Sequence, residues 1–303
     1  MVTRNLLLAS RRSSGPLIEQ IPLAGIQASD ISVARNGEVI YASFAQPSSL
    51  FTSVDGGTTW QTTTLPSSLY TPFYFQCFND GNTVLTGNPM HESVDSGATW
   101  IPYEYNYINN TGNRYSFSQP VGFAASADRQ IIYALAKEYY KNPYSAGDWY
   151  ETSNLYKSVD LGLTYNLVTP DPLGYIYTFS GIHLWCSNDG QTGFVCAAFN
   201  SYSFTTYRTF DGFSTLSVIL TVPDGALKFR GSSDASVLVC NVCSGWQSVD
   251  TEFYVSTDFG TSWKKVSSIG TVKTTDAYDF DVTDDGKTLV VLGKNGITKY
   301  TNF

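Results

Sequence analysis

The sequence predicts an all-β protein built from repeated four-stranded antiparallel units. A motif of eight residues recurs along the chain, and turns of the Asn-Gly or Asp-Gly type return at regular intervals. The segments between these signals are short apolar runs with no convincing amphipathic helix. Because a repeated unit buries its faces only against its neighbours, the repetition favours one domain over residues 1–303.

The repeated motif reads Ser-x-Asp-x-Gly-x-Thr-Trp. Its Asp carboxylate can accept hydrogen bonds from the N–H groups of its own turn. Its Gly supplies a positive φ without a Cβ clash, and its Trp can bury a ring beside the neighbouring strand. We therefore assign a structural role to the motif residues. They are Ser53, Asp55, Gly57 and Trp60; Ser93, Asp95, Gly97 and Trp100; Ser158, Asp160, Gly162 and Tyr165; Asp211, in a worn copy with Phe213 in the Gly place; and Ser256, Asp258, Gly260 and Trp263.

Five such copies in register resemble the Asp-box (bacterial neuraminidase) repeat of sialidase-like and sortilin-like β-propellers. The resemblance implies a single propeller in which the motif joins the third and fourth strands of each blade. It covers most of the chain, and it specifies architecture rather than chemistry.

In this frame the turn signals divide the chain into five complete blades and a sixth blade with three strands. The turn between the first and second strands carries Asn36-Gly37, Asp80-Gly81 or a related pair, so these acids are interpreted as turn formers. The expected strands are 31–34, 39–44, 50–53 and 59–64; 74–78, 83–86, 91–93 and 99–103; 121–124, 131–136, 155–158 and 164–168; 182–186, 193–198, 207–209 and 216–222; 227–230, 236–242, 253–256 and 262–266; and 278–282, 288–292 and 297–300.

The segment Pro16–Pro22 supplies a spare strand that can complete the sixth blade. Such a closure leaves no unpaired edge around the ring. We therefore expect a six-bladed propeller with residues 1–24 as an N-terminal arm and closing strand, and residues 25–303 as the blades. A faint echo of a further strand at Leu6–Leu8 leaves a seventh, partial blade as the alternative.

Composition limits the classes of function. The net charge of −8 argues against nucleic-acid binding through a basic surface. The longest early apolar run, Leu6–Ala9, is too short for an export signal or a membrane span, so a soluble protein is expected. The five cysteines are unevenly spaced, and Cys240-x-x-Cys243 lacks a second ligand pair. We thus expect neither a disulfide framework, nor a metal site, nor a cofactor.

Four long segments are expected to form loops on the face opposite the motif: Glu104–Gln119, Lys137–Ser153, Asp171–Ser180 and Ser244–Glu252. Tyr and Trp mixed with Asn and Ser can form an adaptable contact surface for a protein or a sugar. The same aromatic residues are equally compatible with loops that pack against one another. The candidate binding residues are Tyr107, Arg114, Tyr115, Tyr139, Tyr140, Tyr144, Trp149, Tyr150 and Trp246.

Catalysis is less well supported, and we assign no catalytic residue. Sialidases bind a carboxylate with three arginines from separate blades, but only Arg114 and Arg230 fit the open face. Gln20-Ile21-Pro22 has Gln where the family has Arg. Another glycoside hydrolase would need two carboxylates on that face, and no spacing singles out a pair. The candidate acids are Glu104, Glu138, Asp148, Glu151, Asp250 and Glu252.

The favoured interpretation is a non-enzymatic binding or assembly module. Propellers of this type resemble photosystem assembly factors, sortilin-type receptors and virion-associated phage proteins, and a compact, acidic, Tyr-rich chain looks most like the last group. The expected partner is a protein in a larger assembly or a surface glycan. The alternative is a glycoside hydrolase or carbohydrate-binding protein.

Overall fold

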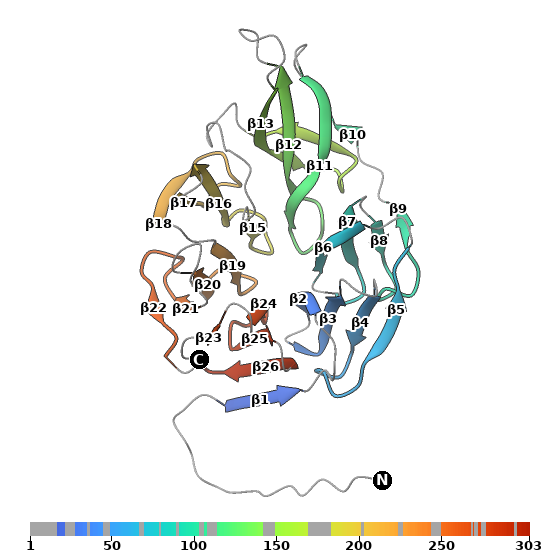
Figure 1. Cartoon of the computed structure of the whole chain (residues 1–303), viewed down its shortest axis with the longest axis vertical. Coiled ribbons are helices and arrows are strands. Elements are labelled where there is room, and N and C mark those ends of the chain that lie inside the picture. Colours follow the sequence, from blue (N-terminus) through green and yellow to red (C-terminus); the bar gives the residue numbers. More distant parts are fainter. Residues whose placement is uncertain are drawn as a thin grey trace, which may run out of the picture.

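The computed structural model shows six β-sheets arranged around a common axis as a six-bladed β-propeller, with no α-helix among the described residues (Figure 1). The residues that it describes are 17–21, 28–34, 37–44, 49–66, 70–78, 80–88, 91–102, 106–107, 114–141, 149–168, 183–200, 203–223, 227–243, 250–267, 269, 272–273, 277–293 and 296–303.

The first three blades follow the chain from the axis outward. Blade 1 contains β2 (Ala28–Ala34), β3 (Val39–Phe44), β4 (Ser49–Ser53) and β5 (Gln61–Thr64); blade 2 contains β6 (Tyr70–Cys77), β7 (Val84–Asn88), β8 (His91–Ser93) and β9 (Ile101–Pro102); blade 3 contains β11 (Arg114–Ala125), β12 (Ile132–Lys141), β13 (Trp149–Ser158) and β14 (Thr164–Leu167), with β10 (Asn106–Tyr107) added parallel to β14.

The last three blades repeat this order. Blade 4 contains β15 (His183–Cys186), β16 (Gly193–Asn200), β17 (Ser203–Thr209) and β18 (Ser217–Pro223); blade 5 contains β19 (Leu227–Gly231), β20 (Leu238–Cys243), β21 (Asp250–Ser256) and β22 (Lys264–Lys265), with β23 (Val272–Lys273) also paired to β21; blade 6 contains β24 (Ala277–Val282), β25 (Thr288–Gly293) and β26 (Gly296–Thr301).

The N-terminal strand β1 (Leu17–Ile21) closes the ring. It pairs antiparallel with β26, in a register that runs from Leu17 opposite Thr301 to Ile21 opposite Ile297. The first described strand of the chain is therefore the fourth strand of the last blade. This confirms both the six-bladed architecture and the closure expected from the sequence.

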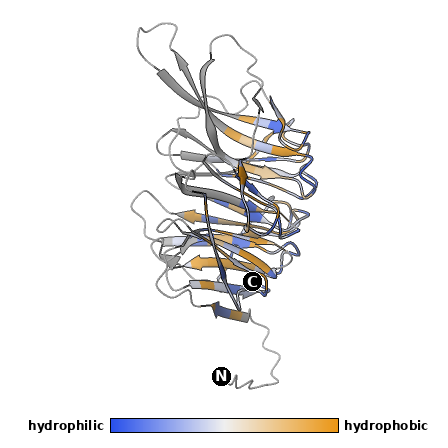
Figure 2. Cartoon of the chain, turned by 90° about the vertical axis from the view of Figure 1, so that its right-hand side faces the viewer, coloured by the Kyte–Doolittle hydropathy of each residue, from blue (hydrophilic) through white to orange (hydrophobic). Residues whose placement is uncertain are grey.

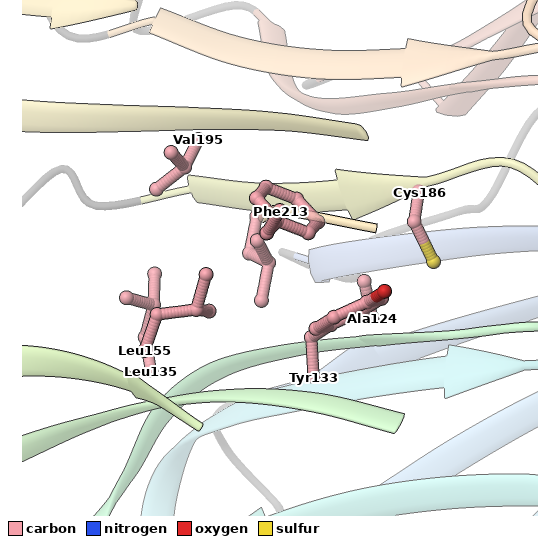
Figure 3. Close-up of a cluster of buried hydrophobic side chains, with 8 residues drawn as sticks. Ala124, Tyr133, Leu135, Leu155, Cys186, Val195 and Phe213 are labelled. Atoms are coloured by element: carbon pink, nitrogen blue, oxygen red, sulfur yellow. The ribbon is translucent and has the colours of Figure 1, made fainter. Parts of the chain in front are cut away.

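The core consists of six apolar clusters, one at each interface between neighbouring blades. Side chains alternate across each strand, so one strand serves two clusters. In β25, Val290 and Leu292 pack toward blade 1, whereas Leu289 and Val291 pack toward blade 5. Because both faces of a blade are buried, a second strand can be a continuous apolar run, as Leu289–Leu292 is in β25. Figure 3 shows the cluster between blades 3 and 4, where Phe213 packs among Tyr133, Leu135, Leu155 and Val195.

The eight-residue motifs form tight turns held by their own side chains. In the first copy Ser53 Oγ accepts a hydrogen bond from Gly57 N (2.7 Å) and donates one to Asp55 Oδ1 (2.8 Å). The Asp55 carboxylate also accepts from Thr59 N (2.8 Å) and Thr59 Oγ1 (2.7 Å). The same four bonds recur around Asp95, Asp160, Asp211 and Asp258.

The turns between first and second strands lie on the same face as the motifs. Backbone bonds join the two kinds of turn within a blade, as in Gly56 N to Glu38 O (2.8 Å). Further bonds join neighbouring blades, as in Asn188 N to Ser233 O (2.8 Å). Figure 2 shows these described turns along one edge of the disc, with hydrophilic and hydrophobic residues mixed among them. We call this side the motif face.

The expectation that residues 104–119 and 137–153 are loops is wrong for most of the described residues in them. β11 begins at Arg114, β12 continues to Lys141 and β13 begins at Trp149, while Asn106 and Tyr107 form β10. These stretches contain Tyr, Phe and Trp, which are residue types that favour strands. Segment 171–180 lies outside the described residues. The possible strand at Leu6–Leu8 lies outside them as well.

Cys77, Cys186, Cys196 and Cys240 are buried and not in disulfides. In the described part of the chain, no helix has the length and apolarity needed to cross a membrane.

Candidate functional site

Blade 3 is larger than the other blades. Its three inner strands have 12, 10 and 10 residues, whereas the inner strands of the other blades have 3 to 8. Leu135 of β12 and Leu155 of β13 pack in the core between blades 3 and 4. Beyond these two residues the three strands continue together, and Figure 1 shows them projecting past the ring. We call this part of β11, β12 and β13 the blade-3 extension.

Most of the predicted binding residues lie on the blade-3 extension, and the strand register brings several of them together. Arg114 of β11 is opposite Tyr140 of β12, which is opposite Tyr150 of β13. These three residues therefore form one row across three strands. Opposite residues of neighbouring strands have Cβ atoms about 4.5–5.5 Å apart, so the row is contiguous along the sheet.

The other predicted binding residues have different positions. Tyr139 is opposite Glu151, and Lys141 is opposite Trp149. Tyr115 lies at a shift of register in β11. Tyr107 is on β10 and pairs with Tyr165 at the outer edge of the blade. Tyr144 and Trp246 lie outside the described residues, as do the candidate acids Glu104 and Asp148.

A second polar group, which the sequence analysis did not find, lies at the propeller axis. It is formed by the innermost strands of blades 1, 5 and 6, which contribute Asp30, Lys228 and Arg230, and Asp279 and Asp281 respectively. Lys228 Nζ contacts Asp30 Oδ1 (3.1 Å) and also binds Asp279 Oδ1. Arg230 Nε lies 3.6 Å from Asp281 Oδ1. We call these five residues the axial cluster.

The carboxylates of the axial cluster also bind backbone groups across the ring closure. Asp279 Oδ2 accepts from Ile31 N and Asp281 Oδ2 accepts from Val33 N, both at 2.8 Å. The other oxygen of each carboxylate accepts from the following residue, Phe280 N (2.7 Å) or Val282 N (2.8 Å). All four oxygens thus accept backbone hydrogen bonds, and the two Oδ2 atoms hold β24 against β2, so the cluster joins blades 6 and 1.

Burial and neighbouring charges shift the pKa values at the axis in opposite directions. Burial raises the pKa of Asp281 to about 6, and it raises the pKa of Asp30 well above the usual value. Lys228 and a hydrogen bond from Asp30 hold the pKa of Asp279 below its usual range, despite the opposing effect of burial. Burial, with Lys228 and Arg230 nearby, lowers the pKa of His183 to about 3. Asp279 is therefore the more acidic of the two carboxyl groups beside Lys228.

Two side chains that the sequence analysis weighed for catalysis have partners within the fold. Arg230, one of two arginines expected on the open face, is paired with Asp281. Glu252 accepts hydrogen bonds from Tyr254 Oη (2.8 Å) and Lys265 Nζ (2.6 Å), and these bonds lower its pKa. Among the described residues, no group of three or more His, Cys, Asp or Glu side chains is placed to hold a metal ion.

Comparison with known proteins supports the fold alone. No protein-family model matches the chain, and no curated protein matches it significantly. Solved propellers do resemble it. The gluconolactonase XC5397 from Xanthomonas campestris is 13% identical with a TM-score of 0.58, and the alignment covers 94% of this chain and 89% of that one. The WD40 repeats of RRP9 are 10% identical with a TM-score of 0.55, covering 95% and 99%.

A third similar structure is AFV00434, described as an ancestral GH74 enzyme. It is 15% identical with a TM-score of 0.53, and the alignment covers 93% of this chain but 36% of the enzyme. These propellers include both enzymes and a WD40 repeat protein, and at such identities the likeness does not transfer an activity.

Proposed function

We propose that this chain is a non-enzymatic binding module of a larger assembly, of the virion-associated kind, and that it contacts a partner protein through the blade-3 extension. One observation carries the proposal. The extension continues a regular three-stranded sheet beyond the blade core, and its register sets Arg114, Tyr140 and Tyr150 side by side.

Such a row has the composition of a contact surface. Tyr combines a large rigid ring with a polar tip and loses little conformational entropy on binding. Arg and Tyr are enriched among the residues that dominate binding energy at protein interfaces. A sheet also holds these residues at fixed spacing, which reduces the ordering cost of association. The axial cluster plays no part in this function, because its oxygens are used within the ring.

Site-specific photo-crosslinking in the native assembly tests the proposal. A photoreactive residue replaces Tyr140 or Tyr150, and a matched one replaces Gln61, which is exposed on β5 of blade 1. We expect a discrete protein adduct from positions 140 and 150 and none from position 61. Adducts at all three positions, or at none, would contradict the assignment of the extension as the interface. An adduct with a glycan would show that the partner is a glycan and not a protein.

A further inference from the structure

In blades 1, 2, 4 and 5, pairing on the outer side of the third strand reaches the first residue of that strand. In blade 1 this residue, Ser49 of β4, is opposite Thr64 of β5. The first residues of β8, β17 and β21 are likewise paired on that side, to β9, β18 and β23. Blade 5 uses two separate segments, β22 and β23, for this purpose. The fold thus covers the outer edge of the third strand in four blades.

The third strand of blade 3 departs from this pattern. β14 pairs with β13 at Tyr156 and Lys157, and a bond from Val168 N to Leu155 O (3.0 Å) extends the contact by one residue. β10 lies on the far side of β14. Among the strands of the described residues, none therefore covers the outer side of residues 149–154, which we call the open edge of β13.

Alternate residues of the open edge direct their backbone groups outward. All ten residues of β13 pair with β12 without a shift of register, so the alternation of a regular strand holds throughout. Leu155 directs its carbonyl outward, to Val168 N. By this alternation the N–H and C=O groups of Ser153, Glu151 and Trp149 also face outward, whereas those of the residues between them face β12. The open edge therefore presents a row of donors and acceptors that matches another strand.

The residues that follow β14 in the sequence are unsuited to this edge. A ladder continued beyond Val168 in the same register would set Pro170 opposite Ser153 and Pro172 opposite Glu151. These are the positions that must donate an N–H to β13, and proline has none. The open edge is therefore not completed by a continuation of β14.

The open edge borders the row of Arg114, Tyr140 and Tyr150. These three residues are opposite one another on β11, β12 and β13, so a strand added beside β13 would extend the row by one residue. Aromatic and β-branched residues make favourable cross-strand pairs with an aromatic residue. An added strand is therefore continuous with the surface through which we propose that the blade-3 extension binds its partner.

The charge at the centre of the open edge favours a different protein over a second copy. Two copies of β13 that pair antiparallel through all three outward residues would set Trp149 opposite Ser153 and Glu151 opposite Glu151 of the other copy. Like charges directly opposite each other destabilise a sheet, whereas opposite charges stabilise it. The complementary segment therefore has Lys or Arg at the place opposite Glu151.

We propose that the partner protein adds an extended segment to the open edge of β13, as a further strand of blade 3. Main-chain hydrogen bonds at Trp149, Glu151 and Ser153 supply affinity, and the residues opposite Tyr150 and Glu151 supply selectivity. The first of these is aromatic or β-branched, and the second is basic. This inference rests on the function proposed above, because it names the kind of partner that the blade-3 extension binds.

Residue-resolved hydrogen exchange, measured on the free protein and on the native assembly, tests strand addition. In the free protein the amides of Glu151 and Ser153 should exchange fast, whereas those of Tyr150 and Thr152, which face β12, should exchange slowly. In the assembly the first two should slow by at least about ten-fold and the other two should change little. A contact made by side chains alone would not protect alternate amides.

Two variants at position 153 separate the backbone from the side chain. Ser153→Pro removes an outward N–H, and an edge strand tolerates proline where the N–H faces solvent. We expect it to melt like the unmodified protein but to lower the yield of the crosslinked adduct from position 140 by at least about ten-fold. Ser153→Ala is the matched control, because it loses the same hydroxyl but keeps the N–H, and it should leave the yield unchanged.

The outcomes distinguish this inference from the function on which it rests. Absence of adducts at positions 140 and 150 would contradict the proposed function itself. Adducts at both positions, with the amides of Glu151 and Ser153 equally fast in both samples, would keep the extension as the interface and overturn strand addition. An undiminished adduct with folded Ser153→Pro would do the same. Slow exchange of these amides in the free protein would also overturn it, because this chain, or a second copy if the protection falls on dilution, would then occupy the edge.

Discussion

Asp281 in the last blade accepts a hydrogen bond from the backbone N–H of Val33 in the first blade, at 2.8 Å. The two residues are 248 positions apart, and Asp279 makes the equivalent bond to Ile31 N. The ring is therefore closed twice. The pairing of β1 with β26 closes it at the outer edge of blade 6, and two carboxylates close it at the axis.

The pH dependence of stability should reveal the axial closure. The pKa of Asp281 is about 6 in the folded protein and 3.8 in the unfolded chain, so the folded state binds more protons between these values. The contribution of the Asp281 carboxyl to the free energy of unfolding is fully present below about pH 4 and is lost as the pH rises through 6. A shift of about 2 pKa units corresponds to about 3 kcal/mol. Urea unfolding measured from pH 4 to 7 should therefore show that the free energy of unfolding of the wild type falls by this amount relative to that of Asp281→Asn.

Asp95→Asn is the control of opposite sign. Hydrogen bonds from Thr99 and Ser93 lower the pKa of Asp95 to about 2, so its contribution is present above about pH 4 and is lost as the pH falls toward 2. Parallel stability profiles for wild type and Asp281→Asn across pH 4–7 would contradict the assignment at the axis.

The serine of the motif offers a test of the turn. Ser53 is buried, and its Oγ accepts from Gly57 N and donates to Asp55. Ser53→Ala leaves a buried N–H without its acceptor and should lower the free energy of unfolding by about 1–3 kcal/mol. Ser53→Thr should cost much less, because Thr209 makes the same two bonds in the fourth copy. Equal losses for the two variants would indicate that packing, not hydrogen bonding, matters there.

Gly193 and Phe213 are predicted to be energetically coupled. A Cβ atom at Gly193 would lie 2.4 Å from the Phe213 ring and 3.2 Å from Trp185 O. Gly193→Ala should therefore destabilise by about 1–3 kcal/mol. Phe213→Leu shortens the side chain at the contact, so the double variant should be less destabilised than the sum of the single changes. Additive values in the double-mutant cycle would contradict a direct contact.

Removing β1 should expose the outer edge of blade 6. A protein without residues 1–21 leaves β26 unpaired on that side, and an unpaired strand is a site of aggregation. We expect a large fall in melting temperature or association into larger species. A protein that lacks only residues 1–16 keeps β1 and serves as the control. If both truncated proteins melt like the full chain and stay monomeric, the strand is not needed for closure.

The features that could be predicted from the sequence are the motif turns and the blades, because they are local and repeated. Each motif carries its own hydrogen-bond partners within eight residues, so the turns and the blade count follow from the pattern. The axial cluster was missed because its members lie on strands far apart in the chain. The signal was present as Asp279-Phe280-Asp281 in one first strand and Lys228-Phe229-Arg230 in another, with matched spacing and opposite charge. Only the order of blades around the ring shows that these strands meet.

The blade-3 extension was misjudged for a different reason. Residues 137–141, Lys-Glu-Tyr-Tyr-Lys, lack the apolar pattern by which a strand in a blade core is recognised. The structure pairs these residues strand to strand, with Tyr140 opposite Tyr150. Residues with this composition are therefore placed in loops by any rule that requires alternating burial.

The last prediction separates binding from hydrolysis. If the blade-3 extension is a partner surface, binding energy should concentrate in a few aromatic residues, and Trp149→Ala and Tyr150→Ala should each weaken attachment by at least about 2 kcal/mol. Replacing Glu138 or Glu151 by Gln should matter much less. If the protein is instead a glycosidase, one of these acid changes should reduce turnover by orders of magnitude while ligand binding survives, because proton transfer needs the carboxylate.

Both quantities can be measured on the same four variants. Attachment is scored by the yield of the crosslinked adduct from position 140, and turnover by hydrolysis of a panel of chromogenic glycosides. Thr152→Ala, next to Glu151 on β13 and opposite Glu138 on β12, controls for a general loss of the sheet. Loss of attachment with the aromatic residues, together with no hydrolysis by the parent protein, is the result expected for a binding module. Hydrolysis that vanishes with a single carboxylate would establish the enzyme instead, because no binding surface requires one acid for turnover.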